Sequence, residues 1–319
     1  MAEINSTSGD NWERKALEKV ALAAIQEQRR ARHWGIFFKL LTFVYLFALL
    51  FIALGWTGKK DGASTGKHTA LVELRGVIGP ESSASADNVV AGLQDAFKDK
   101  RTQGVILRIN SPGGSPVQAG HINDEIKRLR AKYPNIPLYA VVEDICASGG
   151  YYVAVAADQI YVDKGSIIGS IGVLMDGFGF TGLMEKLGVE RRLLAAGKNK
   201  GFLDPFSPIR DDQKEYAETM LDDIHQQFIT VVRQGRGKRL KETPELFSGL
   251  LWVGARSVEL GLADALGSVE YVAREVIKAE DIVDFTPREN IAERVARRFG
   301  AAMAEAVVRT VTVNPMAVR

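Results

Sequence analysis

Residues 145–152 read Ile145-Cys146-Ala147-Ser148-Gly149-Gly150-Tyr151-Tyr152, and they decide the fold that we expect for this chain. The apolar run before them, residues 137–142, opens with a proline and is typical of a buried strand. The run after them, residues 151–157, is apolar on nearly all sides, as in a helix packed inside a domain. A serine at such a junction lies at the positive end of the helix dipole, and neighbouring glycines let other backbone come close. The pattern therefore favours a nucleophile at Ser148, while a plain turn with a serine cap remains the alternative.

The composition narrows the class of protein. The 319 residues carry 41 Lys+Arg against 39 Asp+Glu, so nothing indicates nucleic acid or another strongly charged partner. The single cysteine, Cys146, excludes a disulfide within the chain. A nucleophilic thiol is one interpretation of Cys146, but we favour a small buried residue that ends a strand. The sequence has no His-x-x-x-His or Cys-x-x-Cys pair and no P-loop lysine motif, so we expect no metal and no cofactor.

An apolar segment near the N-terminus predicts one membrane crossing. Residues 1–33 form a polar tail that ends in a cluster of arginines, and residues 34–56 are apolar except for Lys39. At about 1.5 Å per residue the apolar segment spans roughly 35 Å, which exceeds a hydrocarbon core of about 30 Å. The basic cluster predicts a cytoplasmic N-terminus and a domain on the other side of the membrane, which in a bacterium is the periplasm. Lys59, Lys60 and Lys67 after the segment count against this orientation. A cleaved signal peptide is the alternative, because Ala53-Leu54-Gly55 is a small-x-small pattern, but the long apolar region favours an uncleaved anchor.

The rest of the chain alternates between strand and helix patterns. Residues 57–68 are rich in Gly, Ser, Thr and Lys and predict a flexible linker, residues 69–285 a folded domain, and residues 286–319 a C-terminal helix and tail. Strands are predicted at 70–74, 104–109, 137–142 and 159–162, and helices near 87–97, at 117–130, 151–157, 211–233, 269–278 and 290–308. This order predicts an α/β fold with a largely parallel sheet covered by helices, and with active groups at the carboxyl ends of the strands.

A second glycine loop follows the strand at 104–109. It reads Asn110-Ser111-Pro112-Gly113-Gly114-Ser115-Pro116. A glycine pair leaves backbone N–H groups unhindered, which suits an oxyanion, although such a pair alone is typical of a tight turn. Because the strand that ends at Ser148 is predicted to be the neighbour in the sheet, one loop can supply a nucleophile and the other an oxyanion donor.

Four stretches occur in a defined order: Arg108–Gly114, Ala147–Tyr152, Ile168–Val173, and Trp252–Ala255 with Leu260–Ser268. Together they resemble the successive signatures of the signal peptide peptidase A family, membrane-anchored serine proteases with the broad fold of Clp protease and the crotonases. The likeness covers roughly residues 70–277, and the length of the chain fits the short form of the family, with one such domain per chain.

The resemblance implies a Ser-Lys dyad. Residues 197–206 resemble the lysine segment of the family, and the matching position is Lys200, with Lys198 as its competitor and a solvated loop lysine as the non-catalytic alternative. Ser148 would attack the peptide carbonyl while Lys200 accepts its proton. A lysine does this only when it is neutral, which an apolar pocket favours; residues 167–173, Phe202 and Leu203 are candidates for its walls.

Further site residues follow from the same resemblance. Ser170 matches the serine that orients the lysine, and the N–H groups of Gly114 and Gly149 are expected to form the oxyanion hole. Apart from the resemblance, serine proteases more often use a histidine base, and His225 is the one serious rival among the four histidines. Asp222 or Asp223 could orient it only if the helix that carries them were unusually placed.

The resemblance implies an inner-membrane serine endopeptidase that faces the periplasm and degrades cleaved signal peptides without cofactor or ATP. It also implies a ring- or dome-shaped homo-oligomer in which subunit contacts help to complete each site. Two other functions stay open. A crotonase-like acyl-CoA hydratase or isomerase is disfavoured because no glutamate acid/base pair lies near the glycine loops, and a non-catalytic membrane scaffold is disfavoured by the retained serine and lysine.

Overall fold

The computed structural model describes residues 9–53 and 66–287, which fall into two units that are considered separately. The first unit contains the helix α1 (Gly9–Ala53), 45 residues long. Within it, residues 16–51 are long and apolar enough to cross a membrane, judged by length and composition. The helix continues without a break through residue 34, where the predicted membrane segment begins. The last three residues of that predicted segment, most of the predicted linker and the helix predicted at 290–308 lie outside the described residues.

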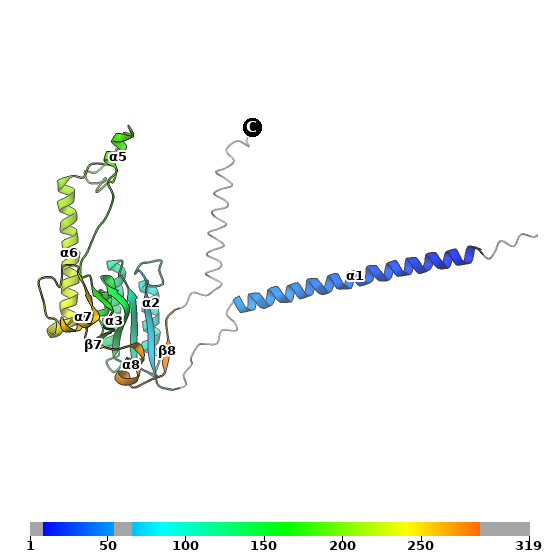
Figure 1. Ribbon diagram of the computed structural model, residues 1–319, viewed down its shortest axis with the longest axis horizontal. Coiled ribbons are helices and arrows are strands. Elements are labelled where there is room, and N and C mark those ends of the chain that lie inside the picture. The colour runs from blue at the N-terminus through cyan, green and yellow to red at the C-terminus, as the bar shows by residue number, and fades with distance from the viewer. Residues whose placement is uncertain (1–8, 54–65, 288–319) are drawn as a thin grey trace, which may run out of the picture. The chain divides into compact units, whose positions relative to one another are not determined.

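The second unit is described over residues 66–287 and is built on an eight-stranded sheet (Figure 1). The strands are β1 (His68–Arg75), β2 (Thr102–Ser111), β3 (Leu138–Ala147), β4 (Gln159–Val162), β5 (Ile167–Gly169), β6 (Leu251–Val253), β7 (Ala265–Leu266) and β8 (Ile282–Asp284). Their order is β6-β5-β3-β2-β1-β8, with β4 between β3 and β7. Every pair is parallel except β5 with β6, so the predicted parallel α/β sheet is confirmed.

The helices α2 (Ala86–Lys98), α3 (Pro116–Lys132) and α4 (Gly149–Ala154) bury their apolar sides in the main core of this sheet. The α2 helix begins where its cap requires: Ser85 accepts a hydrogen bond from the Asn88 N–H, and Val89, Leu93 and Phe97 then point inward together. The other sheet face, which carries Leu71, Ile106 and Val141, packs on α8 (Val269–Tyr271) and the π-helix η2 (Val272–Ile277). The two are consecutive along the chain, so the helix predicted at 269–278 is present, with a π-helical second part that ends at Ile277.

One long helix extends away from the sheet. It is α6 (Asp211–Arg236), 26 residues long, and it is followed by the short helices η1 (Gly237–Arg239) and α7 (Gly254–Glu259). Residues 173–210, which we call the arm, connect the strand β5 to α6 and contain α5 (Thr181–Lys186). Figure 1 shows α5 near the N-terminal end of α6, whereas the sheet lies beside its other end. The arm exposes large apolar side chains, among them Leu174 (81%), Phe178 (79%) and Leu194 (95%).

We expect Leu107→Ala to lower the free energy of unfolding by about 2–5 kcal/mol, because Leu107 is fully buried in the central strand β2 and its loss leaves a cavity. The matched control is Val117→Ala, since Val117 is 63% exposed in the first turn of α3 and its loss should cost less than about 0.5 kcal/mol. Denaturant unfolding of the full chain measures both. Equal losses would contradict the assigned core.

Candidate active site

Ser148 occupies the junction between β3 and α4 in a backbone conformation that is uncommon for a serine. Its φ of 51° and ψ of −123° lie outside the favoured regions, and such strain is concentrated at functional sites. Its N–H donates to the Gly169 carbonyl at 2.8 Å, which ties the junction to β5. The Ser148 side chain makes no capping hydrogen bond to α4, so the alternative of a plain serine cap is wrong.

The second glycine loop lies directly against this junction. A Cβ atom on Gly113 would lie 2.7 Å from the Gly149 nitrogen and 2.8 Å from the Ser148 Cβ, and the φ of Gly113 is +99°. Glycine is therefore required there. The loop is fixed from its other side, because the Ile78 N–H donates to the Gly113 carbonyl at 2.8 Å and the Ile78 carbonyl accepts from Ser115 at 2.9 Å.

Two unpaired backbone donors lie beside Ser148. The Gly114 and Gly149 N–H groups donate no hydrogen bond to any described residue. They are close together, since a Cβ on Gly149 would lie 3.3 Å from the Gly114 nitrogen. Two unpaired N–H groups close together beside a serine are of the kind that stabilises an oxyanion.

A groove of about 600 Å³ opens over these groups. Ser148, Gly149, Gly114 and Ser170 all line it, so the structure brings together four of the five predicted site residues. Ser170 has a φ of 50°, and its N–H donates to the Leu250 carbonyl at 2.8 Å. The rest of the lining is mostly apolar: Pro112, Pro116, Ala119, Tyr152, Gly172, Val173, Leu174, Ile224, Phe228 and Gly249, with Gln227 and Ser248. The contributions of α6 and of Ser248 and Gly249 had no signal in the local sequence, because they come from residues far away along the chain.

The fifth predicted residue, Lys200, is exposed and does not line the groove of its own chain. Its neighbour Phe202 packs on Tyr216 of α6, with the ring centroids 5.8 Å apart, whereas the groove contacts α6 at Ile224, Gln227 and Phe228. The rise from Tyr216 to Ile224, the nearest of these three residues, is about 12 Å along the helix, which is farther than a lysine side chain reaches. The competitor Lys198 lies in the same part of the arm, where its ammonium is 3.7 Å from Asp212.

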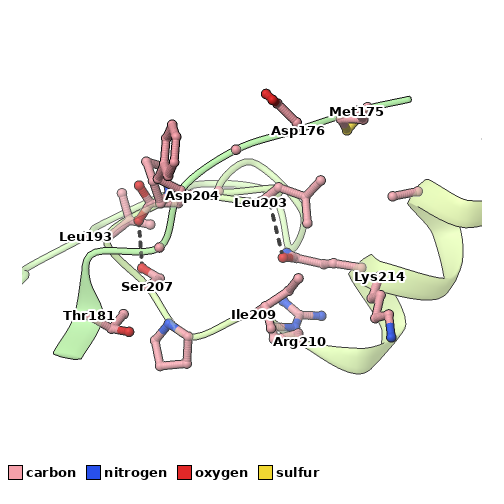
Figure 2. A pocket seen from close by; sticks show the side chains of 18 of the residues that line it. Met175, Asp176, Thr181, Leu193, Leu203, Asp204, Ser207, Ile209, Arg210 and Lys214 are labelled. Carbon is pink, nitrogen blue, oxygen red and sulfur yellow. Dashed lines mark hydrogen bonds between the residues drawn. The ribbon is translucent and has the colours of Figure 1, made fainter. Parts of the chain in front are cut away.

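A second and larger cavity, of about 1,110 Å³, lies between the arm and the N-terminal half of α6 (Figure 2). The Leu203 N–H donates to Gln213 at 3.3 Å, and the Ser207 hydroxyl donates to Asp204 at 2.6 Å. That Ser207 hydrogen bond keeps the pKa of Asp204 below its ordinary value. Neither Ser148 nor Lys200 lines this cavity, and Leu203, a predicted wall of the lysine pocket, belongs to it.

Other candidate residues have different roles. The His225 Nε2 atom lies 3.1 Å from the Ile171 carbonyl, and the side chain does not line the groove. Asp222 accepts a hydrogen bond from Gln226 instead of orienting a histidine. Cys146 is fully buried, and this burial raises the pKa of its thiol, as expected for the residue that ends a strand. Among residues 9–53 and 66–287, no three His, Cys, Asp or Glu side chains gather in a way that could hold a metal ion.

Comparisons with known proteins identify the family. Residues 130–283 match the profile described as Peptidase family S49. A protein of Methanocaldococcus jannaschii that carries the name of a protease is 32% identical over 218 residues, which cover 67% of this chain and 69% of that protein. The chain belongs to peptidase family S49. A protein of Enterococcus faecium named as the signal peptide peptidase SppA is 29% identical over 235 residues, which cover 71% of this chain and 67% of that one. The predicted relation to the signal peptide peptidase A family is confirmed.

Two further similarities concern parts of other proteins or the fold. The Na(+)/H(+) antiporter NhaA of Brucella melitensis is 45% identical over 177 residues, which cover 56% of this chain and 24% of the antiporter. The chain thus spans about a quarter of that relative's length. A mutant of ClpP1 from Listeria monocytogenes superposes with a TM-score of 0.39 at 13% identity, covering 62% of this chain and 91% of that one. The α/β assignment rests on the observed strand order and not on this superposition.

We expect Gly113→Ala to abolish at least 99% of peptidase activity, since the new methyl group would displace Gly149 or Ser148, and misplaced catalytic groups lose about 10²-fold in rate or more. Gly120→Ala is the matched control: nothing lies within 4 Å of its added methyl, and alanine in the interior of α3 should stabilise the helix by about 1 kcal/mol. Peptide hydrolysis and thermal unfolding measure both variants. Full activity in Gly113→Ala would show that the two loops do not form the site.

Proposed function

We propose that this protein is a serine endopeptidase whose nucleophile is Ser148. The observation that carries the proposal is the groove itself. There Ser148 has a strained backbone, its side chain makes no capping hydrogen bond, and two unpaired N–H groups lie beside it. The Ser148 oxygen attacks the peptide carbonyl carbon, and a lysine takes the hydroxyl proton. The N–H groups of Gly114 and Gly149 bind the resulting oxyanion. The C–N bond then breaks as the lysine returns the proton to the leaving amine, and a water molecule hydrolyses the acyl-serine by the same route in reverse.

The lysine in this proposal is Lys200 of a second copy of the chain. Within one chain the arm keeps Lys200 near the far end of α6, whereas the groove presents Ser148 and Ser170 with no lysine among its lining residues. The exposed apolar side chains of the arm support burial against another subunit, because large apolar patches mark interaction sites. In such a homo-oligomer Val173, Leu174 and Phe228 would surround the incoming ammonium and favour its neutral form, and Ser170 would orient it.

The substrate class in this proposal is the cleaved signal peptide and similar apolar peptides. The groove is lined mostly by apolar side chains and glycine, which favours small or aliphatic residues next to the scissile bond. The relative from Enterococcus faecium carries a name of this activity. None of the residues that line the groove is Asp or Glu, which removes the acid/base group that a crotonase-like acyl-CoA enzyme would need there.

The proposed location is the inner membrane, with α1 as a single uncleaved anchor and the peptidase unit in the periplasm. The apolar stretch of α1 is long enough to span, and the arginine cluster precedes its most apolar part.

A reporter fused after residue 65 tests this topology. We expect alkaline phosphatase, which folds only outside the cytoplasm, to be active in the fusion, and a cytoplasm-dependent fluorescent protein to be dark. The opposite pair of results would contradict the periplasmic assignment. Fusions after residue 8 are the internal control. There we expect the phosphatase to be inactive and the fluorescent protein to fluoresce, because the N-terminal tail is proposed to lie in the cytoplasm.

Substitutions test the dyad. We expect Ser148→Ala and Lys200→Ala each to lower kcat for peptide hydrolysis by about 10³-fold or more, because each removes a member of one catalytic unit. His225→Ala and Lys198→Ala are the matched controls and should stay within a few-fold of the unaltered chain, since His225 contacts the Ile171 carbonyl and Lys198 pairs with Asp212 within its own chain. An essential His225 would leave Ser148 as nucleophile but refute the lysine. A parent without any peptidase activity would favour the scaffold.

Mixing the two inactive variants tests whether the dyad forms between copies. When Ser148→Ala and Lys200→Ala chains assemble together, some interfaces combine an intact serine with an intact lysine. With random assembly about a quarter of head-to-tail interfaces are intact, so activity should return to about a quarter of the native value. Co-assembled chains that remain inactive would contradict a lysine supplied by a second copy.

A further inference from the structure

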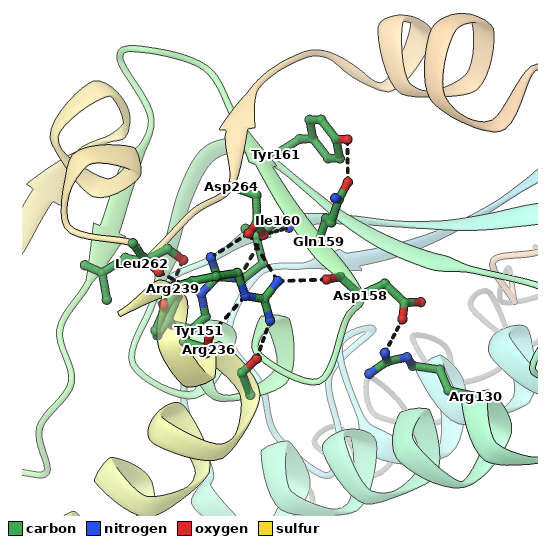
Figure 3. A network of polar contacts seen from close by, with 12 residues as sticks. Arg130, Tyr151, Asp158, Gln159, Ile160, Tyr161, Arg236, Arg239, Leu262 and Asp264 are labelled. Atoms are coloured by element: carbon green, nitrogen blue, oxygen red, sulfur yellow. Dashed lines mark hydrogen bonds and ion pairs between the residues drawn. The ribbon is translucent and has the colours of Figure 1, made fainter. Parts of the chain in front are cut away.

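A buried ion pair lies behind the nucleophile helix, outside the groove (Figure 3). Arg236, the last residue of α6, is only 1% exposed, and its two terminal nitrogens donate to the two Asp264 carboxylate oxygens at 2.8 and 2.9 Å. Its Nε atom donates to the Gly261 carbonyl at 2.8 Å. Asp264 also accepts from the Ile160 N–H of β4 at 2.7 Å. The pair therefore connects the C-terminal end of α6 to the 261–264 loop and to the sheet.

The same loop holds the helix that carries the nucleophile. Tyr151 is three residues beyond Ser148 and fully buried, and its hydroxyl donates to the Leu262 carbonyl at 2.8 Å. Arg239 adds a second contact to Asp264 at 3.1 Å and bonds the Asp158 carbonyl at 2.9 Å. The loop at residues 261–264 is therefore bonded to α4 through Tyr151 and to α6 through Arg236.

The charges in this cluster are compensated. Burial by itself raises the pKa of Asp264, but the hydrogen bonds and charge of Arg236, with the Ile160 N–H and Arg239, outweigh it and keep the pKa below its ordinary value. The carboxylate is therefore ionised at neutral pH. A bidentate arginine fork also fixes orientation, which a single point charge does not.

The position of α6 matters for the site at both ends of the helix. Near its C-terminal end, Phe228 packs on Tyr152 of α4 with the ring centroids 5.2 Å apart, and a Cβ on Gly235 would lie 2.2 Å from the Val155 carbonyl. At its N-terminal end α6 carries the arm. Over 26 residues, about 39 Å, a tilt of about 5° at the C-terminal end moves the other end by about 3 Å. An error of about 1 Å in a reacting group can cost about 10²-fold in rate.

We propose that Arg236 and Asp264 are positioning residues that set the direction of α6 relative to Ser148. They touch neither the groove nor the reacting atoms; they act through α6, whose side chains form one groove wall and whose far end carries the arm. The kinetic part of this inference rests on the proposed peptidase function, whereas the geometric part does not.

A distance measurement tests the geometric part. Spin labels at Lys127→Cys in α3 and Glu215→Cys in α6, both exposed positions, report the direction of α6 in the full-length chain, because the native Cys146 is buried. Labelled chains are diluted with unlabelled ones so that each measured pair lies within one chain. We expect Asp264→Asn to shift or broaden the distance distribution by about 3 Å or more. The matched control is Glu242→Gln. It removes the exposed carboxylate that pairs with Arg233 of α6 through two hydrogen bonds, and it should leave the distance distribution unchanged.

Kinetics test the catalytic part. Expressed per folded molecule, as measured by near-ultraviolet circular dichroism, kcat should fall at least 10-fold in Asp264→Asn, with a smaller change in KM, and should be unchanged in Glu242→Gln. Arg236→Lys keeps a buried positive charge without the planar guanidinium, so its kcat should lie between those of the parent and of Asp264→Asn. It replaces Asp264→Asn in this test if that variant does not fold.

An unchanged distance distribution in Asp264→Asn and Arg236→Lys would overturn the inference, whatever the activity. A loss of activity that follows only the folded fraction would overturn its catalytic part and reduce the pair to a stabilising contact. If the parent proves inactive but the distribution shifts, the peptidase proposal fails while the positioning of α6 by this pair stands.

Discussion

The close approach of two backbone loops is the constraint on which the rest of the site depends. The loop after β2 and the junction after β3 touch so closely that a single methyl group on Gly113 would collide with Gly149 and Ser148. Parallel pairing produces this contact, because it brings the carboxyl ends of neighbouring strands to one edge, and Ser111 is paired with Cys146 there. The strained Ser148 and the two unpaired N–H groups lie at the same contact. In the proposed mechanism, the way two neighbouring strands end places the nucleophile beside its oxyanion donors.

The alternation of strand and helix patterns was sufficient to predict the central sheet. The strands β1 to β4 have apolar runs that propensity and burial both favour, and Ser85 marks the start of α2 through a local cap. The strands β6, β7 and β8 are two or three residues long and owe their existence to partners far along the chain. No local pattern predicts such pairings. The β2–β3 register is irregular between Ile109 and Ser111, at the point where β3 stops pairing with β4 and begins pairing with β5. The sequence did not predict this irregularity either.

The predicted site divides along the same line. Ser148, Gly114 and Gly149 were predicted from glycine motifs at strand ends and Ser170 from the family resemblance, and the sheet brings all four into one groove. Lys200 lies exposed in the arm, and the sequence alone could not place it relative to Ser148. The arm exposes large apolar side chains to solvent, and such exposed apolar patches mark interaction sites. In the proposed homo-oligomer the arm packs on a second subunit, which accounts for its length and its apolar surface. In this account α6 is the connection between the two halves of the chemistry, since one of its ends forms a groove wall and the other carries the lysine.

The most direct test of the central claim is the structure of the assembled full-length protein, determined by electron cryomicroscopy with Ser148 intact. The account predicts that the Lys200 Nζ atom of one copy lies within about 3 Å of the Ser148 Oγ atom of its neighbour, with Ser170 in contact with both. An assembly in which each Lys200 points to solvent, or in which a histidine or another lysine approaches Ser148, would contradict it.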